Sequence, residues 1–61
     1  MKKLTNDQKG QIIIYPYETR GVDEYEYPHG VNATLEVLGY EDRLRFDRDK
    51  EILVWSKVND Y

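Results

Sequence analysis

The sequence predicts a small α+β domain, in which an N-terminal strand and a C-terminal hairpin form an antiparallel sheet that carries one short helix. Three patterns support this: a β-branched run within residues 11–18, a helical spacing of apolar residues within 31–38, and alternation on both sides of a polar turn within 43–58. A chain of 61 residues is short, so we expect a single domain over 1–61, with residues 1–9 loosely ordered.

The first predicted element is a strand over residues 11–18. It contains three consecutive isoleucines followed by Tyr15, and β-branched and aromatic residues are enriched in strands. Pro16 has no N–H group to donate to a neighbouring strand, so this end of the strand is expected at a sheet edge or a bulge.

The middle of the chain allows two interpretations. Residues 31–38 have Val31, Leu35 and Leu38 at the spacing of one helical face, with Asn32 as a candidate N-cap and Gly39 just past the end. The residues 24–27 and 34–37 also alternate with period two. If both stretches are strands, the alternative fold is an all-β five-stranded meander or a small barrel.

The last predicted element is a β-hairpin. Residues 43–47 alternate, with Leu44 and Phe46 on one face, and residues 51–58 form the longest strand-like run, with Ile52, Val54 and Val58 facing one way. The polar residues 47–50 between these two runs are typical of a turn.

Composition argues against catalysis and against a bound metal or cofactor. The chain has no cysteine and one histidine, His29, so it lacks the ligands of a zinc site and the partners of an activated nucleophile. Asp47, Asp49 and Glu51 have the spacing that opens a calcium loop, but the glycine and glutamate that this loop requires are missing. We therefore expect no enzyme, no metal site and no cofactor.

Hydropathy predicts a cytoplasmic protein without a membrane segment. The longest apolar run comprises Ile12, Ile13 and Ile14, whereas a membrane helix needs about 20 apolar residues. No apolar segment follows the basic start at Lys2 and Lys3, so a signal peptide is not expected.

An acidic block is the main functional signal. Residues 18–42 contain seven carboxylates and one basic residue, Arg20, and tyrosines lie among the carboxylates. Tyrosine is enriched in protein interfaces, and carboxylates speed association with basic surfaces. The predicted partner-binding residues are Asp23, Glu24, Tyr25, Glu26, Tyr27, Glu36, Tyr40, Glu41 and Asp42.

This block predicts a small non-catalytic module that binds a larger protein through a basic surface of that partner. One version is an inhibitor from a phage or mobile element, whose carboxylates mimic nucleic-acid phosphates on a nucleic-acid-handling protein. The alternative interpretation gives the block no binding role: the tyrosines pack on the small core while the carboxylates face water.

Two alternatives belong to other classes of function. A self-assembling homodimer would pair the strand of Ile12, Ile13, Ile14 and Tyr15 with its copy. A nucleic-acid-binding small barrel would use Arg43, Arg45, Trp55 and Lys57. The net charge of −3 argues against direct contact with nucleic acid.

Overall fold

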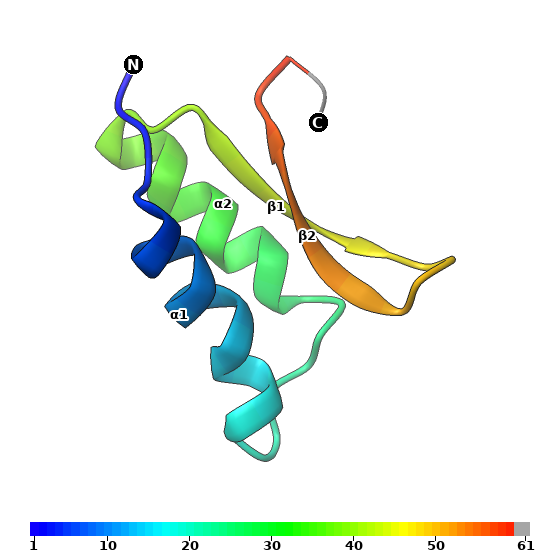
Figure 1. The fold of residues 1–61 in the computed structure, drawn as a ribbon. Coiled ribbons are helices and arrows are strands. Elements are labelled where there is room, and N and C mark those ends of the chain that lie inside the picture. Colours follow the sequence, from blue (N-terminus) through cyan, green and yellow to red (C-terminus); the bar gives the residue numbers. More distant parts are fainter. Residues whose placement is uncertain (60–61) are drawn as a thin grey trace.

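The computed structural model describes residues 1–59. Over these residues the chain forms two helices and a two-stranded antiparallel sheet, in the order α1 (Asn6–Glu18), α2 (Tyr27–Leu38), β1 (Asp42–Asp47) and β2 (Ile52–Lys57). The predicted α+β class is confirmed (Figure 1). The five-stranded meander and the small barrel are wrong, because the described residues hold one hairpin and no further strand.

The predicted N-terminal strand is wrong, because residues 11–18 belong to helix α1. A capping box begins this helix: the Thr5 hydroxyl accepts from the Gln8 N–H at 3.1 Å, and the Gln8 side chain accepts from the Thr5 N–H at 2.9 Å. The two bonds satisfy backbone donors that a helix start otherwise leaves free. This local start signal and the packing of α1 on β2 outweigh the β propensity of the isoleucines.

Helix α2 is longer than the predicted helix and begins at Tyr27 instead of near Asn32. Pro28 lies in its first turn, where a missing N–H costs nothing. The predicted end is confirmed: Gly39 adopts φ +82°, the Gly39 N–H bonds to Glu36 at 3.2 Å, and the Tyr40 N–H bonds to Leu35 at 2.9 Å. This pair of bonds is the Schellman arrangement that favours glycine.

The predicted C-terminal hairpin is confirmed. Leu44 lies opposite Trp55 and Phe46 lies opposite Leu53, so these four side chains share the inner face of the hairpin. Both leucines are buried, whereas Ile52 on the other face is exposed. At the turn, the Asp47 carboxylate accepts from the Asp49 N–H at 3.0 Å.

The helices pack on different strands, α2 on β1 and α1 on β2. Asn32, which is buried and is not an N-cap, joins α2 to β1: its amide accepts from the Leu44 N–H and donates to the Leu44 carbonyl, both at 2.7 Å. The Val58 N–H donates to the Glu41 carbonyl, and hydrogen-bonded and non-hydrogen-bonded pairs alternate along an antiparallel ladder. The pair of Leu44 and Trp55 is therefore a non-hydrogen-bonded pair, so the N–H and carbonyl of Leu44 point away from β2. Asn32 therefore takes the place of a third strand at Leu44.

A second buried polar group, Asp42, ties the N-terminal segment to the sheet. Its carboxylate accepts from the Leu4 N–H at 2.7 Å and lies 3.3 Å from the Lys9 Nζ. Lys2 adds backbone bonds to Gly39 at 3.0 Å and from Glu41 at 2.9 Å. The chain start, α1 and β1 thus meet around one carboxylate.

We predict that Asn32→Ala lowers the free energy of unfolding by about 2–4 kcal/mol, because it leaves two buried backbone groups of Leu44 without partners. Asn32→Asp keeps the volume but sets a carboxylate against the Leu44 carbonyl, so it should also destabilise. Thr34→Ala, an exposed site on the same helix, is the control. Urea unfolding measures all three, and an Asn32→Ala variant within about 0.5 kcal/mol of the parent would contradict the assignment.

Candidate functional site

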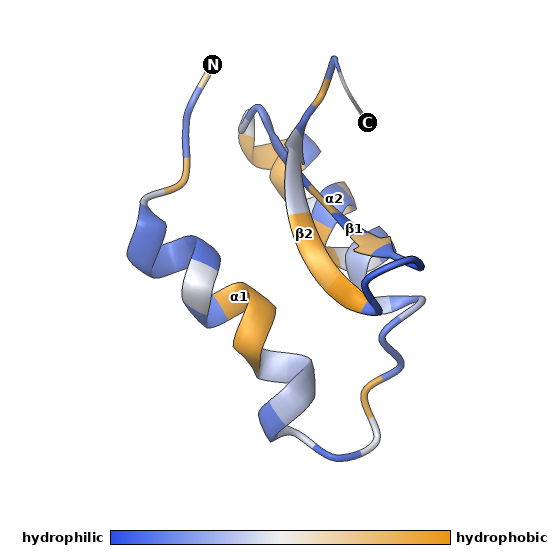
Figure 2. Ribbon diagram, turned by 45° about the vertical axis from the view of Figure 1, so that its right-hand side comes forward, coloured by the Kyte–Doolittle hydropathy of each residue, from blue (hydrophilic) through white to orange (hydrophobic). Residues whose placement is uncertain are grey.

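An open groove of about 790 Å³ lies between α1 and α2. It exists because each helix packs on its own strand, while the contacts between α1 and α2 are made around Tyr27. Figure 2 shows the apolar residues in the middle of α1 in orange. The lining is mostly apolar and consists of Leu4, Ile12, Gly21, Val22, Asp23, Glu26, Tyr27, Gly30, Val31, Thr34, Leu35, Leu38 and Tyr40.

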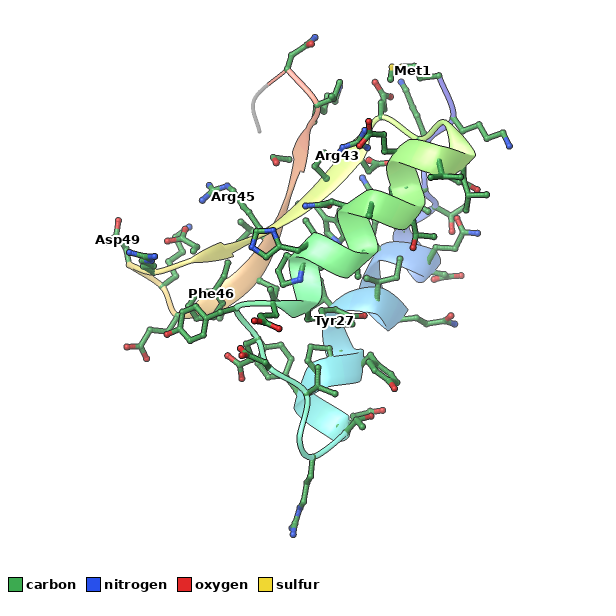
Figure 3. All side chains as sticks on the ribbon, turned by 180° about the vertical axis from the view of Figure 1, so that it is seen from behind. Met1, Tyr27, Arg43, Arg45, Phe46 and Asp49 are labelled. Carbon is green, nitrogen blue, oxygen red and sulfur yellow. The ribbon has the colours of Figure 1, made fainter. Side chains whose placement is uncertain are left out.

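Tyr27 bridges the two helices across the groove. Because Pro16 has no N–H, the carbonyl of Ile12 four residues earlier lacks its partner within α1. The Tyr27 hydroxyl donates to this carbonyl at 2.7 Å, and the Tyr27 ring stacks on Tyr15 with centroids 5.8 Å apart. Figure 3 shows Tyr27 between the start of α2 and α1. The proline that was expected to mark a strand edge instead creates the acceptor that links the helices.

Four of the nine predicted partner-binding residues line the groove: Asp23, Glu26, Tyr27 and Tyr40. Asp23 and Glu26 are exposed at the end near the α1–α2 connection, and Tyr40 lies with its ring 5.8 Å from the Lys2 Nζ. The predicted alternation of residues 24–27 does not form, because this segment is a turn leading into α2. Its start is held by the Asp23 carboxylate, which accepts from the Tyr25 N–H at 2.8 Å.

Tyr25 and Glu24 precede α2 but do not line the groove. Tyr25 is exposed and packs on Phe46 with ring centroids 4.8 Å apart. The two rings border a smaller hollow of about 270 Å³ whose lining also includes His29 and the cationic side chains of Arg45 and Arg48. Glu24 is half-buried in the connection between the helices, and Glu36 is exposed on the last turns of α2.

Glu41 and Asp42 complete the predicted set, but their charges are paired inside the protein. Glu41 lies 3.6 Å from the Lys3 Nζ, and Asp42, which is 4% exposed, faces Lys9. The acidic block of seven carboxylates therefore contains two that are paired within the protein, at the start of β1, and three that lie in the connection between the helices.

Two of the four residues predicted for a nucleic-acid-binding surface, Trp55 and Arg43, form hydrogen bonds within the protein. The Trp55 indole N–H donates to the Lys9 carbonyl at 3.3 Å, on the face of the hairpin opposite Arg45. Arg43 is buried and donates to the carbonyls of Tyr40 and Asp42 at 2.8 and 2.7 Å. The dimer strand of Ile12, Ile13, Ile14 and Tyr15 is also wrong, because these residues are helical and offer no strand edge.

Sequence reasoning missed the groove, although part of its signal was present. The sequence predicts the helical stripe of Val31, Leu35 and Leu38, and in the structure all three residues line the groove. The other wall contains Ile12, which the β propensity of residues 11–18 assigns to a strand and the structure places in helix α1. The pattern Thr5-x-x-Gln8 ahead of the apolar run is the signal that indicates a helix start there.

Within residues 1–59, no three side chains of the metal-ligating types gather into a cluster. Neither helix has the length and apolar character needed to cross a membrane in this part of the chain. Comparison with protein-family models, curated proteins and solved structures gives no match.

The link between Tyr27 and Pro16 predicts a coupling that a double-mutant cycle measures. Tyr27→Phe keeps the ring but leaves the Ile12 carbonyl unpartnered, which should cost about 1 kcal/mol of stability. Pro16→Ala restores an N–H that bonds to the same carbonyl, so Tyr27→Phe should cost less in that background. Equal costs in both backgrounds, measured by urea unfolding, would show that Tyr27 and Pro16 act independently.

Tyr27 also predicts a dependence of stability on alkaline pH. Burial, with a further contribution from Tyr15, raises the pKa of Tyr27 above its ordinary value of 10.0. The unfolded chain therefore loses this proton first as the pH rises past about 10, and the folded state loses stability there. We expect the difference in free energy of unfolding between the parent protein and Tyr27→Phe to be constant up to about pH 9 and to shrink above pH 10. A constant advantage over the whole range would contradict this.

Proposed function

We propose that this protein is a small non-catalytic binding module that docks its exposed acidic segment onto a basic site of a larger protein. The segment comprises Asp23, Glu24, Tyr25 and Glu26, between α1 and α2. The observation that carries the proposal is the division of the acidic block. Within the described residues, the ion pairs of the block are Lys3–Glu41 and Lys9–Asp42, and neither uses a carboxylate of this segment.

The charge of this segment is therefore available to a partner. Asp23 and Glu26 are exposed and Glu24 is half-buried, so their field reaches solvent and can steer a basic surface towards the segment. Tyr25, which is 61% exposed, adds a large aromatic surface beside the carboxylates. Tyrosine contributes contact area with little loss of side-chain entropy, which suits a docking surface.

A basic site on a nucleic-acid-handling protein is one such partner surface. There the carboxylates would take the positions of phosphates, and the module would act as an inhibitor of the kind that a phage or mobile element encodes. Three carboxylates within four residues support competition for one local basic site, and they do not form a long ladder of charge.

The second candidate function is direct binding of nucleic acid at the hollow near the hairpin. His29, Arg45 and Arg48 line it beside Tyr25 and Phe46, and a cationic surface with aromatic rings suits single-stranded nucleic acid. The acidic segment lies next to this hollow and opposes phosphate binding. Retention of the intact protein on single-stranded DNA that falls with added salt would favour this candidate over protein binding.

The test of protein binding is the double variant Glu24→Lys/Glu26→Lys. The partner is first isolated by affinity capture with the intact protein, and its affinity is then measured by titration calorimetry. We expect a loss of at least about tenfold for this variant, and a weaker affinity of the parent protein at higher salt.

The matched control is Asp49→Lys/Glu51→Lys, which makes the same change of charge at the exposed tip of the hairpin. It should retain the affinity of the parent protein. Unchanged binding by Glu24→Lys/Glu26→Lys, or an equal loss in both variants, would exclude a specific role of the acidic segment.

A further inference from the structure

The groove between α1 and α2 has the shape and the lining of a site for an apolar occupant. Its volume of about 790 Å³ lies within the roughly 300–1,000 Å³ typical of binding pockets. Val31 is half-buried in it, and Leu38, which is 51% exposed, leaves half of its apolar side chain in solvent. Ile12 on α1 faces this stripe from the other wall.

Three polar side chains of the lining form hydrogen bonds within the protein. The Tyr27 hydroxyl donates to Ile12, the Thr34 hydroxyl donates to Gly30 at 3.1 Å, and the Asp23 carboxylate accepts from Tyr25. Few groups are therefore left to orient a polar small molecule, which such a ligand requires. The groove instead suits apolar side chains presented by a larger element.

The carboxylates at the rim of the groove favour an occupant that carries positive charge. Asp23 and Glu26 lie at one end of the groove, and no lysine or arginine among residues 1–59 lines it. A basic occupant complements these carboxylates. A second copy presents the same acidic rim, and the described residues that line its groove include no lysine or arginine to pair with these carboxylates.

We propose that this groove binds an amphipathic α-helix of the partner, with basic residues beside its apolar face. Its apolar side chains, spaced at i, i+3 or i+4, and i+7, enter between Ile12 and the α2 stripe of Val31, Leu35 and Leu38. A lysine or arginine at one end of that helix lies against Asp23 and Glu26. The inference rests on the proposed function and names the element of the partner that is recognised.

The experiment uses a fluorescent peptide of about 18 residues, made of leucine and lysine at helical spacing, and a scrambled peptide of the same composition. Fluorescence anisotropy with the full chain measures both affinities. We expect the amphipathic peptide to bind at least about tenfold more tightly than the scrambled one.

Three variants locate the binding. Leu38→Gln and Val31→Gln, which make the groove polar without changing its charge, should each weaken the amphipathic peptide about tenfold. Val37→Gln is the matched control, because Val37 is 85% exposed on the same helix and does not line this groove. Circular dichroism verifies that each variant is folded, and Leu38 is exposed enough for its exchange to leave the core intact.

The outcomes separate this inference from the proposed function. Equal binding of both peptides that is lost only in Glu24→Lys/Glu26→Lys would overturn the groove as the site and support the acidic segment alone. Absence of peptide binding, an equal loss in all three variants, or a dimer in sedimentation that Leu38→Gln dissociates would each overturn the helix as occupant. The proposed function is then decided by its own test with the isolated partner.

Discussion

The two hydrogen bonds between the Asn32 amide and the Leu44 backbone are the interaction on which the rest of the structure depends. A two-stranded sheet is marginal alone, and its strand edges carry unpaired backbone groups. Asn32 satisfies one such position in the centre of β1, at the residue whose side chain is fully buried. It thereby fixes how α2 lies along β1, because a shift of one residue would leave a buried amide and a buried backbone pair without partners.

Polar contacts hold α1 in a corresponding way on the other strand. The Tyr17 hydroxyl accepts from the Leu53 N–H at 3.2 Å, Trp55 donates to the Lys9 carbonyl, and Lys9 faces Asp42. These contacts run from α1 to the sheet, whereas the contacts to α2 are made by Tyr27. Beside the Tyr27 contact, Ile12 of α1 and the apolar stripe of α2 line the open groove. The groove follows from a sheet of only two strands, because each helix packs on a different strand and the space between the two helices stays open.

The parts of the fold that could be predicted are those in which local pattern and tertiary environment agree. The alternation around Leu44 and Phe46 and the glycine after Leu38 each indicate the structure that forms. The β-branched run of α1 indicates a strand on local propensity, and packing on β2 reverses it. A single sequence shows that Pro16 removes a donor, but it does not show that Tyr27, eleven positions later, supplies another one.

For the candidate site, too, local sequence predicts the residue types but not their partners in the folded protein. Composition identifies an acidic, tyrosine-bearing block, but composition cannot separate carboxylates that have internal partners from those that face solvent. Asp42 and Glu26 look alike in the sequence, yet Asp42 holds the chain start and Lys9 while Glu26 lies at the rim of the groove. The difference arises because Lys9 reaches Asp42 only once α1 is a helix packed on the sheet. Lysines of the same chain thus pair with two of the seven carboxylates, whereas Asp23 and Glu26 keep their charge beside an open apolar groove.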